Sequence, residues 1–303
     1  MAVQTEIWVR YIMNRLWKDN TFLQYAFSDD QYVVGGKIVH IPQPGSKPNI
    51  VKNRNTYPAA AVQRTDTDIL YALDRYTSDP THIEAADLLE ITYDKISSVF
   101  GDHAGTLVET IADDMIIKWL SGIGAGNILR TTGAATASKV TGQTGNRKAF
   151  SVLDAKRAQT KMNLMKVLKT DRYAMLESNH MDEFTDGLTV NQEKQFSEYY
   201  DAKEGIVGKL FGFTFLERTN VAIATSANAI EALGASVDAT DNVVSMFWQK
   251  DSVTRAIGEK KFFERKDDPE YYGDMYSALL RAGGRRRRAD DAGVIAMIQD
   301  TAS

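Results

Sequence analysis

The sequence predicts an α+β protein, because helical and strand-like patterns follow one another in separate blocks rather than in strict alternation. A long helical pattern occupies residues 80–120. Patterns of period two, typical of strands, gather in the second half, most clearly at residues 209–218, where phenylalanines alternate with other side chains. An extended, proline-rich segment precedes the long helix. These three observations set the fold class, and no repeat of fixed period competes with it.

A short helix is predicted at residues 7–17, and apolar side chains cover nearly its whole circumference. A helix that is apolar all round is normally buried, whereas a chain terminus is disordered unless another element holds it. We therefore expect an N-terminal arm over residues 1–30 that contacts a neighbouring subunit. The side chains expected to make this contact are Ile7, Trp8, Tyr11, Ile12 and Trp17.

An extended loop is predicted over residues 31–64. A strand pattern at residues 32–41 leads into a segment with four of the six prolines of the chain. Each proline fixes its own φ and disfavours helix at the residue before it. The loop has little apolar surface to bury against its own domain, so we expect it to reach a neighbouring subunit. Its expected contact residues are Lys37, Lys47, Lys52 and Arg54.

The long helix, residues 80–120, is expected to be bent or broken at Gly101. Asp79 is a candidate N-cap and Pro80 suits the first helical position. The following stretch, residues 121–148, is rich in glycine, threonine, alanine and serine, which predicts a flexible surface loop. Together these segments define a first domain at residues 65–148.

A second unit is predicted over residues 149–258. It begins with a helix at residues 151–168, with a serine N-cap and strongly basic outer faces. Its strands are expected at residues 173–176, 209–218 and 243–248.

The C-terminal segment, residues 259–303, is expected to form antiparallel strands at residues 260–265, 274–282 and 293–299. The last two are separated by Gly283-Gly284 and a charged tip. This tip could contact DNA phosphates or an acidic patch of a neighbouring subunit, and it could equally be a solvated hairpin end. Its residues are Arg285, Arg286, Arg287 and Arg288.

No motif indicates a catalytic, cofactor or metal site. The glycines at residues 122–126 follow a helix rather than a strand, so they are interpreted as a helix stop and not as a phosphate loop. Residues 205–210 resemble the end of a P-loop but lack its first glycine and its Ser/Thr. The four histidines are scattered, and His180 near Asp182 is the nearest approach to an acid–base pair. We expect no enzymatic activity and no cofactor; an enzyme with an unrecognised site stays an alternative.

Composition supports this view. A hydrophobic content of 43% and a charged content of 25% are ordinary for a soluble globular protein. The net charge of −4 disfavours a free DNA-binding module, which would usually be basic. The absence of cysteine excludes disulfides and thiolate chemistry and fits a reducing cytoplasm. No apolar run approaches the roughly 20 residues that span a bilayer, so no membrane partner is expected.

The order of these parts resembles that of tailed-bacteriophage major capsid proteins with the Hong Kong 97 fold. The resemblance covers most of the chain and rests on the arm-like helix, the extended loop, the helix after Asp79-Pro80 and two strand segments. The residues that carry it are Gly35-Gly36-Lys37-Ile38-Val39-His40-Ile41-Pro42, Arg64-Thr65-Asp66-Thr67-Asp68, Tyr173-Ala174-Met175-Leu176 and Gly212-Phe213-Thr214-Phe215. The family has no invariant catalytic motif, so the combined pattern carries the comparison.

The resemblance implies an architecture for each segment. Residues 1–30 would be the N-terminal arm and residues 31–64 the extended loop. Residues 65–148 would be a peripheral domain built on a spine helix, and residues 149–258 an axial domain near the capsomer centre. Residues 259–303 would return to the peripheral domain.

The resemblance also implies a function. Copies of the chain would form the hexamers and pentamers of an icosahedral shell around packaged double-stranded DNA, assembled in the host cytoplasm. The implied partners are other copies, a separate scaffold, a portal, decoration proteins and DNA held by weak non-specific contacts. Some relatives crosslink a loop lysine to a neighbour, but nothing in this sequence indicates that chemistry. Encapsulin nanocompartment shells share the fold and are the nearest alternative.

Overall fold

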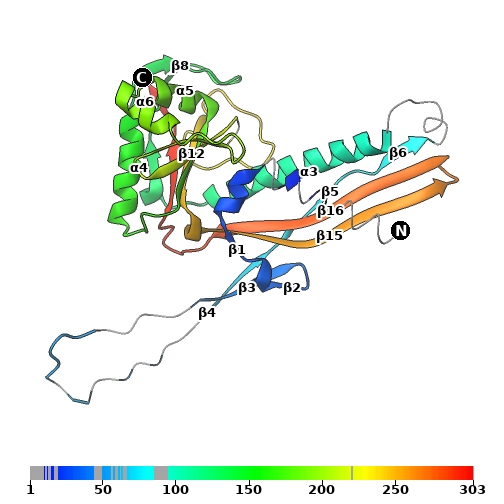
Figure 1. Ribbon diagram of the computed structural model, residues 1–303, viewed down its shortest axis with the longest axis horizontal. Helices are drawn as coiled ribbons and strands as arrows, with labels where there is room; N and C mark the ends of the chain where they lie inside the picture. Colours follow the sequence, from blue (N-terminus) through cyan, green and yellow to red (C-terminus); the bar gives the residue numbers. More distant parts are fainter. Residues whose placement is uncertain are drawn as a thin grey trace.

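The computed structural model has a mixed α/β architecture. Figure 1 shows a compact block of sheet and helices, a long helix and hairpin that extend from it, and a loop that projects separately. The structure describes residues 10, 12, 15–16, 20–43, 50–55, 57–58, 61, 63, 67–84, 95–219 and 221–302.

A long antiparallel hairpin runs along one side of the molecule. Its strands β15 (Val253–Asp268) and β16 (Gly273–Arg286) belong to a five-stranded sheet with order β1-β15-β16-β5, in which β6 also pairs with β16. The shorter strands are β1 (Phe27–Ser28), β5 (Asp74–Thr77) and β6 (Thr81–Glu84). Helix α3 (Lys95–Leu120) lies alongside this sheet (Figure 1).

Helix α3 packs on the sheet through a broad apolar face, as its periodicity predicted. Met115 and Trp119 are buried in the same core cluster as residues of β15 and β16. The Trp119 indole N–H donates to the Thr254 carbonyl oxygen at 2.9 Å. A Cβ on Gly284 of β16 would lie 2.4 Å from the Met115 sulfur. Gly283-Gly284 is therefore part of a strand, where glycine lets the helix approach closely, and the prediction that it lies between strands is wrong.

The predicted helix over residues 80–120 is wrong at its start. Thr81–Glu84 form the strand β6, which pairs antiparallel with β16. Pro80 stands between β5 and β6 at the sheet edge, where the missing N–H costs no ladder bond. Pairing with a distant strand thus overrides a local helix-start signal. The helix is also continuous through Gly101, where a bend or break had been expected.

The compact block contains a seven-stranded sheet with order β11-β12-β10-β14-β17-β7, and β13 pairs with β14. Both β10 and β14 are buried at every position. The bounds are β7 (Ile128–Arg130), β10 (Arg172–Glu177), β11 (Ile206–Leu210), β12 (Phe213–Arg218), β13 (Ala222–Ala224), β14 (Asn242–Gln249) and β17 (Val294–Ile298).

This sheet separates two apolar cores. Tyr173 and Met175 of β10 belong to the core shared with α3, whereas Ala174 and Leu176 belong to a second core on the opposite face. The alternation follows from the two-residue period of a strand. The helices of the second core are α4 (Val152–Leu164), α5 (Ser178–Asp186) and α6 (Val190–Ser197).

The predictions for the second half are confirmed in part. The strand expected at residues 173–176 is β10, and the helix expected at residues 151–168 is α4, which begins with a Ser151–Asp154 capping box. The strand expected at residues 209–218 is instead a hairpin of β11 and β12. Phe211 occupies its turn with φ +51° beside Gly212, so the alternating pattern continues only through Phe213 and Phe215.

Residues 121–148 are not one irregular loop. They contain η3 (Ala125–Asn127), β7, β8 (Ala135–Ala137) and β9 (Asn146–Lys148). The strands expected in residues 259–303 divide between sheets, because β17 lies beside β14 in the seven-stranded sheet and β18 (Asp300–Ala302) pairs with β9. Only β15 and β16 stay beside α3.

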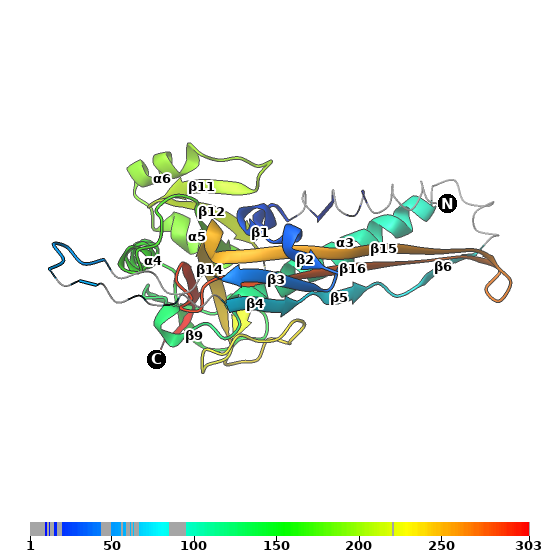
Figure 2. The same cartoon turned by 90° about the horizontal axis from the view of Figure 1, so that it is seen from below.

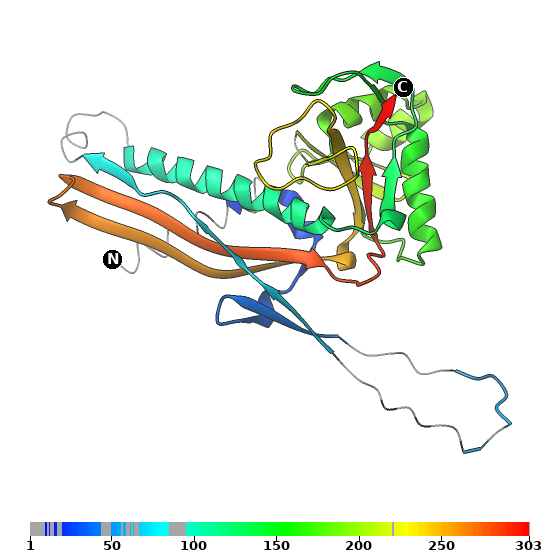
Figure 3. The same cartoon turned by 180° about the vertical axis from the view of Figure 1, so that it is seen from behind.

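A small three-stranded sheet of order β2-β3-β4 forms the base of the projecting loop (Figure 3). Its strands are β2 (Val33–Val34), β3 (Ile38–Gln43) and β4 (Thr67–Ala72). Three further 3-10 turns are η1 (Thr21–Tyr25), η2 (Asp30–Tyr32) and η4 (Lys250–Ser252). Within the described part of the chain, no helix has the length and apolar character needed to cross a bilayer.

Candidate inter-subunit surfaces

The described part of the predicted arm is attached to its own chain. Leu16 is fully buried in the core shared with α3, and Ile12 packs against that core. The Arg15 guanidinium donates to the Gly101 carbonyl oxygen. A Cβ on Gly105 would lie 3.0 Å from Arg15 Nη2, so the two helical glycines leave room for this side chain. The other predicted arm contacts, Ile7, Trp8, Tyr11 and Trp17, lie outside the described residues.

The base of the loop is fastened to the long hairpin. The turn between β2 and β3 contains Gly35 and Gly36, both at positive φ. The Gly36 carbonyl oxygen accepts a hydrogen bond from the Glu259 backbone N–H at 3.4 Å. The pairing of β15 with β16 shifts register between Ile257 and Lys260, which places this bulge under the turn. Figure 2 shows β2 and β3 beside β15.

Lys37 marks the second point of attachment. Its carbonyl oxygen accepts a hydrogen bond from the Leu73 N–H at 2.8 Å, while its side chain is exposed. Leu73 is buried with Val39, Ile41 and Ala256 in a small cluster between the loop base and β15. The base of the loop is therefore rigid, and the predicted contact residue Lys37 presents its ammonium group to solvent.

The described tip of the loop is exposed. Ile50 is 89% exposed and Tyr57 is 76% exposed. Lys52 is exposed and Arg54 is partly exposed, whereas Lys47 lies outside the described residues. Figures 1 and 3 show residues 50–55 far from both large sheets. Large apolar side chains without cover are typical of interaction sites.

The arginine run is not a solvated hairpin tip. Arg285 and Arg286 belong to β16, and Arg287 lies over the Phe27 ring at 4.1 Å. Of the four, only Arg288 is exposed, and it pairs with Asp290 at 2.8 Å. The prediction that these residues form a solvated hairpin tip is therefore wrong, whereas the contact with DNA or a neighbouring subunit stays a prediction.

Arg286 binds the C-terminus of α3. It donates to the carbonyl oxygens of Trp119 at 2.9 Å, Ser121 at 2.7 Å and Gly122 at 3.1 Å, and it pairs with Asp291 at 2.5 Å. The last carbonyl groups of a helix have no intrahelical partner and carry partial negative charge. The Arg286 guanidinium supplies these carbonyl groups with hydrogen-bond donors and places a positive charge beside their partial negative charge. The glycines that follow are thus a helix stop, as predicted, with an arginine cap that the sequence did not reveal.

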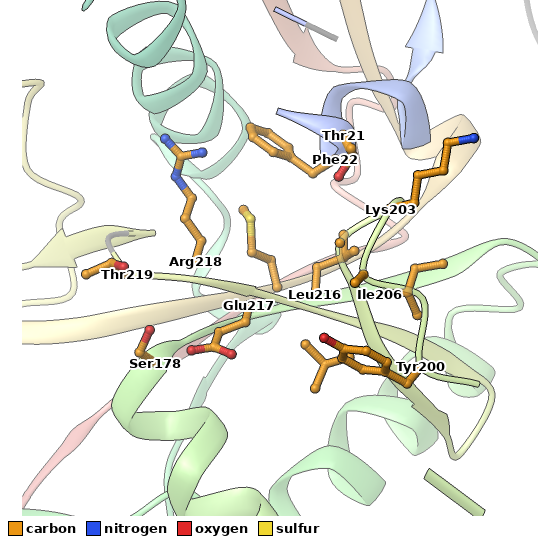
Figure 4. Close-up of a pocket in the computed structure, with 14 residues that line it drawn as sticks. Thr21, Phe22, Ser178, Tyr200, Lys203, Ile206, Leu216, Glu217, Arg218 and Thr219 are labelled. Atoms are coloured by element: carbon orange, nitrogen blue, oxygen red, sulfur yellow. The ribbon is translucent and has the colours of Figure 1, made fainter. Parts of the chain in front are cut away.

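Figure 4 shows a pocket of about 600 Å³ between η1, the β11–β12 hairpin and the start of α5. Glu217 is the only carboxylate among its described lining residues, and no histidine lines it. Arg218 extends towards α3, where it pairs with Asp113 at 2.6 Å. The other titratable side chains of its lining are Tyr200, Lys203 and Arg218.

His180 has a structural role. Its Nδ1 lies 2.8 Å from the Ser245 hydroxyl, and its ring stacks on Phe150. Complete burial lowers the pKa of His180 to about 4, so the ring is neutral. Asp182 is exposed, so the two residues form no acid–base site. In the described part of the chain, no group of three or more histidines and carboxylates could hold a metal ion.

No family model and no curated protein matches the chain. Several solved structures are similar to the chain. The capsid of Ralstonia phage GP4 matches with a TM-score of 0.63 and 12% identity, over 92% of this chain and 88% of that one. The capsid of cyanophage P-SCSP1u matches with a TM-score of 0.61 and 16% identity, over 92% of this chain and 87% of that one. A structure of Mycobacterium phage Che8 matches with a TM-score of 0.58 and 14% identity, over 91% of this chain and 90% of that one.

The chain has the fold of a phage capsid protein. The capsid of an empty GTA particle shares the fold as well, with a TM-score of 0.59 over 93% of this chain. The identities, all between 12% and 16%, are too low to carry more than the fold.

Proposed function

We propose that the chain is the major capsid protein of a tailed bacteriophage. The observation that carries the proposal is the extent of the fold similarity, which covers 92% of this chain and 88% of a phage capsid protein. A match of this extent leaves little of either chain for a different task. In this proposal the chain is a structural component of a virion rather than an enzyme.

In this proposal each part of the fold has a role in the shell. Helix α3 is the spine of a peripheral domain with β15 and β16, and the seven-stranded sheet is the core of an axial domain. Residues 31–64 are an extended loop that contacts a neighbouring subunit, and Lys37, Lys52 and Arg54 are among its contacts. The exposed Ile50 and Tyr57 support this role, since water-exposed apolar area is a source of binding energy once covered.

Copies of the chain would assemble into hexamers and pentamers of an icosahedral shell in the host cytoplasm. Each interface needs only a modest area, about 1,000 Å², because closed symmetry repeats it many times. A net charge of −4 suits a container for double-stranded DNA, because affinity for DNA grows with every phosphate neutralised. A scaffold, a portal and decoration proteins are the further partners in this scheme.

Electron microscopy of the purified chain tests the proposal. The chain is expressed alone and together with a scaffold encoded beside it, and each preparation is examined after negative staining. Polyhedral shells, or rings of five or six subunits, are the expected result. A discrete monomer or dimer in both preparations would contradict it. Measuring nucleic acid in shells from infected cells separates a phage capsid, which contains DNA, from a cargo-holding nanocompartment.

A further inference from the structure

Asp29 is an acidic residue at a site where a negative charge is unfavourable. Its side chain, between β1 and η2, is fully buried. One carboxyl oxygen, Oδ1, has no hydrogen-bond partner among the described residues. A buried carboxylate without full pairing is disfavoured, whereas the neutral carboxylic acid costs much less to bury. The site therefore favours the protonated form of Asp29.

The backbone places this carboxyl group where three segments meet. Strand β1 pairs parallel with β15, and the Asp29 N–H continues the pairing by donating to the Arg255 carbonyl oxygen at 2.8 Å. The Tyr71 hydroxyl of β4 donates to Asp29 Oδ2 at 3.0 Å. The same hydroxyl lies 3.4 Å from the Thr254 hydroxyl of β15. The segment of β1 and η2, the loop base and the long hairpin thus share one carboxyl group.

The positive charges near Asp29 are engaged by other groups. Arg255 pairs with Asp30, the adjacent carboxylate, at 3.4 Å. The Arg287 guanidinium lies over the Phe27 ring at 4.1 Å. No ion pair with a described residue compensates a charge on Asp29.

Burial is the main influence on the ionisation of Asp29. It raises the pKa of Asp29 above its ordinary 3.8, and the charge of Asp30 adds a smaller increase. The hydroxyls of Tyr71 and Thr254 and the charge of Arg287 lower the pKa by less. Burial also raises the pKa of Tyr71 well above neutral, so this hydroxyl keeps its proton and stays a donor.

We propose that protonation of Asp29 controls how firmly the loop base is held against the long hairpin. In the closed state, Tyr71 contacts Asp29 and the carboxyl group is buried. In the open state, Tyr71 has separated from Asp29 and water reaches the carboxyl group. The proposal concerns a single copy of the chain and does not depend on the capsid function.

The direction of the pH dependence follows from proton linkage. Between the ordinary pKa of Asp29 and its raised value, the closed state holds a proton that the open state has lost. Raising the pH therefore favours opening, by at most about tenfold for each pH unit because one proton is released. Above the raised pKa both states are ionised, and the dependence ends. The loop base is thus held most firmly in acid.

Amide hydrogen exchange of the purified chain measures the opening. The Leu73 N–H donates to the Lys37 carbonyl oxygen at 2.8 Å and reports on the loop base. Its protection factor, corrected for the intrinsic pH dependence of exchange, should fall as the pH rises from 4 and then become constant. In Asp29→Asn, which is neutral at every pH, it should not change. Asp182→Asn removes the same charge at an exposed position of α5 and should keep the profile of the unaltered chain.

The variant Tyr71→Phe gives a second measurement in which Asp29 itself is kept. It removes a hydroxyl that donates to the carboxyl group, so the pKa of Asp29 should rise further. The protection factor should then become constant only at a higher pH. Tyr32→Phe is the matched control, because its ring packs on the same small cluster as Tyr71, and it should leave the profile unchanged.

The outcomes decide the proposal. A pH dependence that is lost in Asp29→Asn and shifted to higher pH in Tyr71→Phe establishes the role of Asp29. Equal profiles for Asp29→Asn and the unaltered chain overturn it, and so does a loop base that opens more in acid. If Asp29→Asn does not fold, an unshifted profile in Tyr71→Phe overturns it. None of these results depends on shells, so the capsid proposal is tested separately by electron microscopy.

Discussion

Gly258 of β15 lies directly against Gly36 of the β2–β3 turn, so closely that a Cβ on residue 258 would be 2.4 Å from the Gly36 carbonyl oxygen. The same Cβ would be 2.6 Å from a Leu73 methyl group. Both contacts are too short for any real side chain. The loop base can therefore attach to the bulge of β15 only because residue 258 is glycine.

The change Gly258→Ala should loosen the loop base. Overpacking at a tight contact costs about 1–3 kcal/mol. We expect a lower midpoint of denaturant unfolding and faster proteolysis within residues 31–64. Gly126→Ala is the matched control, because nothing lies within 4 Å of a Cβ there. Equal behaviour of the two variants would mean that the loop base is not held at this contact.

Leu16→Ala tests whether the arm belongs to the fold of its own chain. Leu16 is fully buried, and replacing a buried leucine with alanine costs about 2–5 kcal/mol. Leu153→Ala on the exposed face of α4 should change the free energy of unfolding by less than about 0.5 kcal/mol. Unfolding of each purified variant in urea measures the change in the free energy of unfolding.

The same buried leucine limits how the arm can be truncated. Deletion of residues 1–20 would remove Leu16 and also Asn20, whose side-chain oxygen accepts a hydrogen bond from Arg218 at 2.7 Å. Loss of shells after that deletion could therefore come from unfolding. Deletion of residues 1–9 leaves both side chains in place, so a loss of shells after this deletion would reflect assembly and not unfolding.

Arg286→Ala should destabilise the chain far more than Arg288→Ala. Arg286 binds three carbonyl groups at the end of α3 and the Asp291 carboxylate, and hydrogen bonds from a charged donor contribute about 1.5–3 kcal/mol. Arg288 is part of an exposed pair, where the expected loss is about 0–1 kcal/mol. Thermal and denaturant unfolding of the two variants measure these losses of stability. Equal losses would refute the role of Arg286 as a helix cap.

His180 should make stability depend on pH between about 4 and 6.5. Its pKa falls from the ordinary 6.5 to about 4 on burial, so in this range the unfolded chain binds a proton that the folded chain does not. Stability is therefore lost as pH falls, by roughly 3 kcal/mol in all. Below about pH 4 no further loss from this residue occurs.

The comparison of His180→Gln with the unaltered chain isolates that effect. The pKa values of Glu177 and Glu183 are raised by burial, so their contribution to stability grows as pH falls, but it is common to both chains. The difference in unfolding free energy between the two chains should change steadily from pH 6.5 to pH 4. A difference that is constant over this range would show that His180 is not buried in its neutral form.

Local signals predicted several elements correctly. The short apolar run at residues 173–176, the Ser151–Asp154 capping box and the helical stripe through Trp119 each identify an element from residues a few positions apart. The local signals gave wrong predictions where pairing with a distant strand competes with the local preference. Residues 81–84 carry a helix-start signal, yet they pair with β16, almost two hundred residues later in the chain.

Local patterns were enough to predict a chain of mixed helices and strands with a proline-rich extended segment, because φ restriction by proline and side-chain periodicity act over a few residues. Tertiary structure alone decided the use of the arginine run and the sheet that each late strand joins. Arg286 meets the Trp119 carbonyl 167 positions away along the sequence. A partner at that distance leaves no local pattern, so the role of such a residue is decided only when the chain is folded.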